Sequence, residues 1–285
     1  MTMCSGCKEG SVEHDFDLKC RNRAKKMGNT DRLKTTFDKV ADLYDKARPG
    51  YPEQLIEDVL TLSEIPPGGT ILEIGCGTGQ ATQLFAAHGY TMLCLEFGAH
   101  LAVFAAKNCR QYHNVTIQNI SFEKWAVQEK FDLVISAQAF DWIPPEIGYS
   151  KAFESLKDSG SIALFRNDIP DTDTEVSCAL DEVHQNIMPH LAEQRKEGWD
   201  SVAKKTENHI KASGLFKKVI TRHYLWSEQY SPQEYINLIR TYSTFHTLDK
   251  ETQHNLLSGI REVVEHFGGI EVQYVATLSI AKVKR

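Results

Sequence analysis

Three glycines at alternate positions, Gly75, Gly77 and Gly79, follow an apolar run that begins at Ile71. Glycine weakens strands and helices, so three of them at this spacing indicate that another group lies very close to the backbone. Exposed amides at a helix N-terminus bind anionic or polar ligands, because that end of the helix carries a partial positive charge. The motif therefore predicts a cofactor site. A tight turn needed only for packing is the alternative.

Two glutamates accompany the glycine motif. Glu73 stands two residues before Gly75, and Glu96 ends the next predicted strand. A carboxylate at the end of that strand can accept hydrogen bonds from both hydroxyl groups of a ribose. Dinucleotide-binding loops have the spacing G-x-G-x-x-G, and here Gln80 occupies the position of the last glycine. The spacing therefore argues against a dinucleotide.

Predicted strands and helices alternate between residues 70 and 167, which is typical of a doubly wound, mostly parallel sheet. The first five predicted strands span residues 70–75, 90–96, 114–118, 130–136 and 160–167. Two later strands, 216–226 and 270–285, are expected to complete a seven-stranded α/β sheet with an antiparallel last strand. Such sheets bind ligands beyond the carboxyl ends of their strands, where the glycine motif lies.

Helical segments precede and follow this pattern. Residues 1–30 are expected to form a disordered tail, and residues 31–285 one domain. The segments 34–62, 171–213 and 231–266 are predicted to be helical covers over the carboxyl end of the sheet. Within them we expect helices at Thr174–Glu197 and Ser201–Ala212, and a capping box in which Ser231 is paired with Glu234.

The composition narrows the possible partners. The 285 residues carry a formal net charge of −6, with 41% hydrophobic and 25% charged residues. Binding to polyanions relies on positive potential, so nucleic acid is not a favoured partner. No apolar stretch approaches the ~20 residues that a membrane helix needs, so no membrane partner is expected. The oligomeric state is expected to be a monomer or a homodimer.

The seven cysteines favour a reducing compartment. Their number is odd, and the N-terminus lacks the apolar core of a secretory signal, so a cytoplasmic location is expected. Cys4, Cys7, His14 and Cys20 could in principle bind zinc, but their spacing is loose. No metal is therefore assigned. Met27 opens a more regular stretch and could be the true start.

The pattern [DE]-x-G-x-G-x-G together with Glu96 resembles the class I S-adenosylmethionine (SAM) methyltransferases. The stretches "FDKVADLYDKARPGYP", "ISFEKW" and "SAQAFDWI" resemble a subgroup of small-molecule enzymes related to the trans-aconitate methyltransferases. The similarity runs from about Lys34 to the C-terminus. It implies a Rossmann-like fold, SAM as the cofactor, and a methyltransferase domain over residues 31–285.

The resemblance also implies roles for individual residues around SAM. The three glycines and Gln80 would form the loop around its methionine part, with Glu73 ordering the loop and Glu96 binding the ribose. Phe97, Ser121 and Phe122 would line the adenine pocket, where many relatives have an acidic residue that this chain lacks. The remaining contacts would be Ala137 and Gln138 beside the methionine, and Tyr44, Arg48 and Tyr51 as an N-terminal cover.

Some of these roles have alternatives. Arg48 could bind the methionine carboxylate with two hydrogen bonds, or it could be a surface residue while Tyr44 belongs to the core. Asp141 could act as a base, bind a cationic or hydroxylated acceptor, or cap a helix near Ile143–Pro145. An ionised Asp141 would repel an anionic acceptor unless a nearby cation neutralises it. Aromatic side chains in the late helices could line an acceptor pocket but are more typical of a core: Trp199, Tyr235, Tyr242 and His246.

The leading hypothesis is a SAM-dependent methyltransferase that acts on a small molecule, with O-methylation of a carboxylate or hydroxyl favoured. A carboxylate acceptor needs no general base, whereas a hydroxyl does. Methylation of RNA or protein is an alternative, as is a SAM-binding protein without catalysis.

Overall fold

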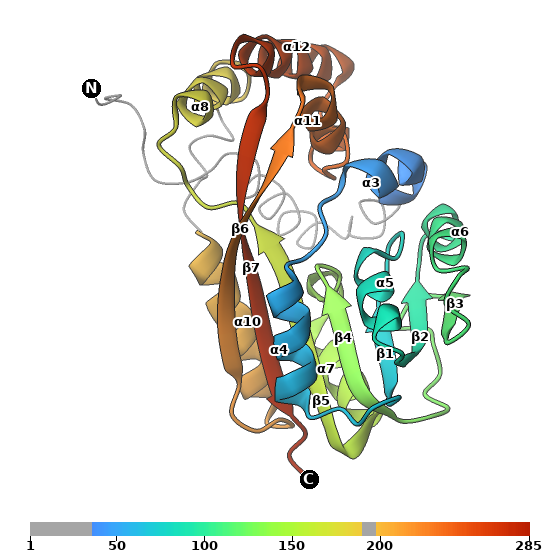
Figure 1. Cartoon of the computed structure of the whole chain (residues 1–285). Coiled ribbons are helices and arrows are strands. Elements are labelled where there is room, and N and C mark those ends of the chain that lie inside the picture. Colours follow the sequence, from blue (N-terminus) through green and yellow to red (C-terminus); the bar gives the residue numbers. More distant parts are fainter. Residues whose placement is uncertain (1–35, 190–197) are drawn as a thin grey trace. The chain divides into compact units, whose positions relative to one another are not determined.

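The computed structural model describes residues 36–189 and 198–285. Its centre is a seven-stranded sheet in the order β3-β2-β1-β4-β5-β7-β6 (Figure 1). The strands are β1 (Thr70–Ile74), β2 (Thr91–Glu96), β3 (Val115–Asn119), β4 (Phe131–Ala137), β5 (Leu156–Asp168), β6 (Ile220–Tyr230) and β7 (Ile270–Lys282). The first five are parallel, and the last strands run antiparallel. The predicted fold class is confirmed.

The strand order reverses between β1 and β4. The chain leaves β1 toward β2 on one side and enters the sheet again at β4 on the other. Helices that follow these two strands therefore cover opposite faces, and the loops after β1 and β4 meet at the carboxyl edge, where α/β folds bind their ligands. β7 lies between β5 and β6, so β6 forms the edge of the sheet.

The described chain forms two compact units. The sheet unit comprises Gly50–Asn167, Val202–Tyr224 and Ala276–Arg285. The helical unit comprises the described residues within Met1–Pro49, Asp168–Ser201 and Leu225–Val275. Strands β6 and β7 contribute residues to both units, and each unit has its own apolar core.

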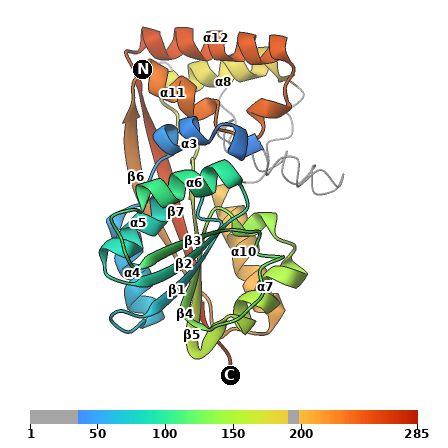
Figure 2. The same cartoon turned by 90° about the vertical axis from the view of Figure 1, so that its right-hand side faces the viewer.

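Helices cover both faces of the sheet unit. They are α4 (Glu53–Ser63), α5 (Gln80–Ala87), α6 (Ala99–Asn108), α7 (Pro145–Glu154) and α10 (Trp199–Ser213). Figure 2 shows α4 and α5 on one side of the sheet and α7 and α10 on the other. Because both faces are covered, the central strands are apolar throughout, and Leu72, Leu133 and Val134 are completely buried.

The helical unit contains α3 (Ala41–Ala47), α8 (Glu175–Ile187), α11 (Pro232–Ile239) and α12 (Lys250–His266). The predicted capping box at the start of α11 is confirmed, because Ser231 and Glu234 each bond the other's backbone. Tyr235 and Tyr242 are buried in the apolar core of this unit, as aromatic side chains at helical spacing usually are. Gly259 of α12 lies so close to α8 that an added Cβ would be 2.8 Å from Val183.

The local structure differs from the sequence analysis in two places. The helix predicted over Thr174–Glu197 is not continuous, because α8 ends at Ile187 and Met188 leaves the helical conformation. The last part of that prediction, residues 190–197, lies outside the described residues. A short 3-10 helix, Phe140–Trp142, lies between β4 and α7 and was not predicted. The tail over residues 1–30, with its cysteines and His14, lies outside the described residues. Among the residues that are described, no helix is long and apolar enough to cross a membrane.

Candidate functional site

The glycine loop joins β1 to α5. Gly75, Gly77 and Gly79 have φ angles of 71°, 60° and 92°, which side chains rarely tolerate. A Cβ at Gly75 would be only 2.3 Å from the Cβ of Ala139, and one at Gly79 would be 3.2 Å from the sulfur of Cys109. Packing therefore accounts for part of the glycine requirement. The loop approaches the segment after β4 on one side and α6 on the other.

Glu96 lies directly beside this loop. Its Oε2 accepts a hydrogen bond from the amide of Gly77 at 2.9 Å, and its Oε1 accepts one from Gly98 at 2.7 Å. The residue is 7% exposed. A carboxylate can accept about four hydrogen bonds, so these two amides are compatible with ribose hydroxyls as further donors. The loop and Glu96 are thus brought together as the sequence predicts.

Glu73 lies beneath the loop and is completely buried. Its Oε2 accepts hydrogen bonds from the hydroxyl of Thr82 at 2.6 Å and the thiol of Cys94 at 3.5 Å. Burial raises the pKa of Glu73 to about 7; the two hydrogen bonds oppose this rise, and the charge of Glu96 adds to it. Glu73 therefore connects β1 to α5 and β2 and supports the loop from below.

Two further side chains, those of Gln80 and Phe97, lie beside the loop. The Nε2 of Gln80, the first residue of α5, is buried and donates to no acceptor among the residues that the structure describes. A buried donor of this kind costs free energy unless something accepts from it. Phe97, next to Glu96, is 40% exposed. Asn119 fixes this corner by donating to the carbonyl oxygens of Glu96 and Phe97 at 2.9 and 3.0 Å.

Ser121 and Phe122 form a turn after β3. The carbonyl of Ser121 accepts from the amides of Lys124 and Trp125, both at 3.0 Å. The ring of Phe122 is 3% exposed and stacks on Trp125 with centroids 6.3 Å apart. Phe122 belongs to the apolar core of the sheet unit. Contact of either residue with adenine stays a prediction.

Gln138 directly follows β4, which ends at Ala137. It has a φ of 64°, which is uncommon for a residue other than glycine and indicates local strain. Two hydrogen bonds hold it there: its amide donates to the carbonyl of Phe165 at 2.9 Å, and its Nε2 donates to that of Asn167 at 2.7 Å. The chain after β4 is thereby fixed against the end of β5.

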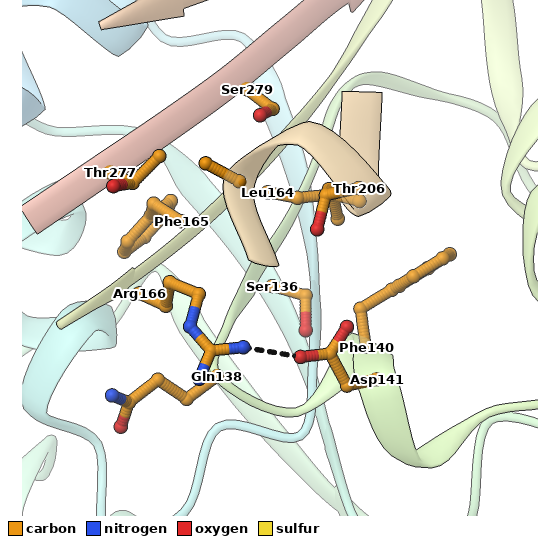
Figure 3. A pocket seen from close by; sticks show the side chains of 11 residues that line it. Ser136, Gln138, Phe140, Asp141, Leu164, Phe165, Arg166, Thr206, Thr277 and Ser279 are labelled. Atoms are coloured by element: carbon orange, nitrogen blue, oxygen red, sulfur yellow. Dashed lines mark hydrogen bonds and ion pairs between the residues drawn. The ribbon is translucent and has the colours of Figure 1, made fainter. Parts of the chain in front are cut away.

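Asp141 forms an ion pair that the sequence did not reveal. Its Oδ2 is 2.6 Å from Nη1 of Arg166, near the carboxyl end of β5 (Figure 3). The side chain of Arg166 is 8% exposed and that of Asp141 is 40% exposed. The helix-cap role for Asp141 is wrong, because α7 begins after Pro144 without a side-chain cap. Pro145 at the first helical position has no N–H to satisfy, so less is gained from capping there.

The ion pair lies in a small pocket of the sheet unit that is partly open to solvent. The pocket is bounded by β4, the 3-10 helix, β5, α10 and β7 (Figure 3). Its lining residues are Ser136, Gln138, Phe140, Asp141, Leu164, Phe165, Arg166, Ala203, Thr206, Thr277 and Ser279. The sequence contains an indication that Arg166 is paired. It is a charged residue inside an otherwise apolar strand, and a charged residue that is buried needs a partner.

The three residues expected to cover the cofactor belong to different units. In the helical unit, the guanidinium of Arg48 lies over the rings of Tyr44 and Tyr242, 5.1 and 4.5 Å from their centroids. It also donates to the carbonyl of Thr241 at 3.1 Å. In the sheet unit, Tyr51 packs edge-on against Phe165 with centroids 5.0 Å apart. Their contacts with SAM stay predictions.

The known proteins that this chain resembles are methyltransferases, which agrees with the glycine loop and Glu96 at the carboxyl edge of the sheet. A family model described as a methyltransferase domain matches residues 71–160, from β1 into β5. A malonyl-[acyl-carrier protein] O-methyltransferase of Paenibacillus is 26% identical over 73% of this chain and 78% of its own length. One from Herminiimonas arsenicoxydans is also 26% identical, but the match spans 58% of this chain and only 62% of the relative.

A solved structure shares the fold. It is a phosphoethanolamine N-methyltransferase of Haemonchus contortus, with a TM-score of 0.51 and 15% identity over 87% of this chain and 58% of that protein. At this identity the likeness concerns the fold alone. The strand order, the glycine loop and the matched methyltransferase domain together support a class I SAM methyltransferase.

Proposed function

We propose that this protein transfers the methyl group of SAM to an oxygen atom of a small-molecule acceptor. The observation that carries the proposal is the meeting of the glycine loop with Glu96 at the carboxyl edge of the sheet, where Gly77 bonds the Glu96 carboxylate. The malonyl-[acyl-carrier protein] relatives, which are named as O-methyltransferases, support oxygen as the atom that is methylated.

The residues present fit SAM. The carboxylate of Glu96 suits the ribose hydroxyls, and the exposed ring of Phe97 beside it suits the flat face of adenine. The buried Nε2 of Gln80 supplies a donor for the polar methionine end. The loop lacks the spacing that a dinucleotide pyrophosphate requires. Each part of the cofactor thus has a matching group at this edge.

The chemistry requires positioning above all. When bound, SAM supplies a methyl group on a positively charged sulfur, which makes that carbon electrophilic. The protein must hold the acceptor oxygen in line with the methyl and exclude water. Gln138 is suited to this task, because its two hydrogen bonds lock the strained end of β4 between the loop and the pocket. A carboxylate oxygen can react without a base, whereas a hydroxyl must lose a proton.

Labelled methyl transfer tests this proposal. The protein is incubated with methyl-labelled SAM and metabolite pools separated into anionic, neutral and cationic fractions. We expect label in small molecules, and mild alkali should release it as methanol if the product is a carboxyl methyl ester. Label that instead precipitates with RNA or protein would favour the macromolecular alternative. Binding of SAM without any transfer would favour a non-catalytic protein.

A further inference from the structure

Three buried thiols lie in and beside the glycine loop. Cys76 belongs to the loop, Cys94 to β2, and Cys109 directly follows α6; they are 5%, 0% and 3% exposed. Cys109 lies against Gly79, where an added Cβ would be 3.2 Å from its sulfur. The methyl transfer proposed above uses none of these thiols, so their place beside the cofactor loop has no role in that reaction.

Backbone hydrogen bonds hold Cys76 beside the strand that carries Cys94. Strands β1 and β2 pair in parallel with Glu73 opposite Cys94. The amides of Gly75 and Cys76 both donate to the carbonyl of Leu95, the residue after Cys94, at 2.8 and 3.1 Å. The two thiols are also hydrogen-bonded to each other, and this contact together with burial raises the pKa of Cys76 well above its usual value. The sheet thus keeps the two sulfur atoms together.

Glu73 is the carboxylate of this cluster. Its Oε2 accepts the thiol hydrogen of Cys94 at 3.5 Å, and its Oε1 is buried without a donor among the residues that the structure describes. Burial raises the pKa of Cys94 to about 11, so this thiol keeps its proton at neutral pH unless a base takes it. Glu73 is a base within hydrogen-bond reach of Cys94, as the attack of a thiol on another sulfur requires.

We propose that Cys76 and Cys94 form a modification site, at which a hydroperoxide converts the two thiols to a disulfide that weakens SAM binding. This inference goes beyond the proposed function, because it concerns the state of the cofactor loop and not the acceptor. A disulfide between two cysteines of a reducing compartment is reversible, since thiols reduce it again. The pair would make cofactor binding sensitive to oxidation.

The oxidation has two steps. The sulfur of Cys76, the more exposed of the two, attacks the peroxide; the oxygen–oxygen bond breaks, which leaves a sulfenic acid on Cys76 and releases an alcohol, or water from hydrogen peroxide. The sulfur of Cys94 then attacks that of Cys76 and displaces hydroxide. Glu73 accepts the thiol proton of Cys94, and this proton converts the hydroxide to water. Two thiols and one hydrogen peroxide thus give one disulfide and two water molecules.

The bridge should affect the cofactor through Gly77. The sulfur atoms of a disulfide are about 2.0 Å apart, much closer than two thiols in hydrogen-bond contact, so Cys76 must shift toward β2. Gly77 is the next residue, and its amide bonds the Glu96 carboxylate that is expected to bind the ribose. If the bridge weakens SAM binding, bound SAM must oppose the bridge by the same factor, because the two equilibria are linked.

Peptide mapping of the full chain tests the inference. The reduced protein is treated with hydrogen peroxide, with or without saturating SAM, and remaining thiols are blocked with N-ethylmaleimide. Chymotrypsin can cut at Phe85 and Tyr90, between the two cysteines, so mass spectrometry detects the bridge as a linked pair of peptides. We expect the pair Cys76–Cys94, formed at least tenfold more slowly with SAM. After removal of peroxide, S-adenosylhomocysteine affinity should be at least tenfold lower by calorimetry, and dithiothreitol should restore it.

Single substitutions supply matched controls. Cys76→Ser and Cys94→Ser should lose the linked peptides and the effect of peroxide on S-adenosylhomocysteine affinity. Cys109→Ser, which alters the third buried thiol, and Cys178→Ser, which alters a half-buried one on α8, should keep both, because the bridge uses neither thiol. If a serine variant of the pair does not fold, the peptide map of the wild type still decides which cysteines are joined.

Three results would overturn the inference. They are no linked peptides from Cys76 and Cys94, a bridge from Cys76 to Cys109 instead, or a bridged protein that binds S-adenosylhomocysteine as tightly as the reduced one. Failure of the proposed function looks different. In that case the reduced protein binds neither SAM nor S-adenosylhomocysteine, or binds them without methyl transfer, while the peptide map still reports on the two thiols.

Discussion

Gly77 donates its amide hydrogen to the carboxylate of Glu96 across 2.9 Å. This bond joins the loop after β1 to the end of β2, two segments that are adjacent only because these strands pair in the parallel sheet. It places a negatively charged acceptor beside backbone that bears no side chain. The proposed binding of the SAM ribose depends on this contact.

Replacing Glu96 with Ala should lower the affinity for SAM at least tenfold. The change removes charge-assisted hydrogen bonds to the ribose, each worth about 1.5–3 kcal/mol. Isothermal calorimetry with S-adenosylhomocysteine measures the effect, and Glu146→Ala, which alters an exposed glutamate of α7, is the control. If Glu96→Ala lowers thermal stability but leaves the affinity unchanged, then Glu96 only braces the loop through Gly77 and Gly98.

Much of this site could be predicted because its residues are close in sequence to strand ends. Apolar runs predict the strands, and ligand binding at the carboxyl edge of such a sheet then places the glycine loop and Glu96 together. The capping box formed by Ser231 and Glu234 could be predicted equally well, because it is a local interaction. Local patterns of this kind determine most of the fold.

What could not be predicted depends on long-range contacts. Arg166 and Asp141 are 25 residues apart, and nothing in either stretch indicates that they pair. The approach of Ala139 to Gly75 likewise follows only from the packing of two loops at the carboxyl edge. A helix-cap role for Asp141 was the local interpretation, and the distant arginine overrode it.

Glu73 should make stability depend on pH. Its pKa rises from 4.5 to about 7 on folding. Below pH 4.5 Glu73 is protonated in both the folded and the unfolded state. Above about pH 7 it is ionised in both states, and the folded state is then destabilised by a buried negative charge. Stability should fall as pH rises from about 4.5 to 7, by about 3 kcal/mol at roughly 1.4 kcal/mol per pH unit.

The variant Glu73→Gln stays neutral at every pH and should lose this slope. Urea unfolding at pH values from 4.5 to 8 compares it with the wild type and with Glu146→Gln, which changes the charge equally at an exposed site. The control should keep the wild-type profile. A wild-type slope in Glu73→Gln would mean that another group titrates over this range.

Gly75→Ala should destabilise the protein more than Gly89→Ala. Both glycines have positive φ angles, 71° and 83°, so both variants bear a backbone cost of about 1–2 kcal/mol. A Cβ added at Gly75 would lie 2.3 Å from the Cβ of Ala139, whereas a Cβ added at Gly89 would have no neighbour within 4 Å. Overpacking adds about 1–3 kcal/mol, which gives a total of about 2–5 kcal/mol for Gly75→Ala. Equal losses in chemical denaturation would show that the loop can shift away from Ala139.

The choice of cofactor shows whether the glycine loop binds SAM or a dinucleotide. Isothermal calorimetry of the purified chain with SAM, S-adenosylhomocysteine and NAD compares the two classes of ligand that a glycine loop at this edge could bind. We predict saturable binding of SAM and S-adenosylhomocysteine at one site per chain, with no binding of NAD, because Gln80 stands where a dinucleotide loop needs its last glycine. Tight binding of NAD together with no binding of SAM would contradict the account.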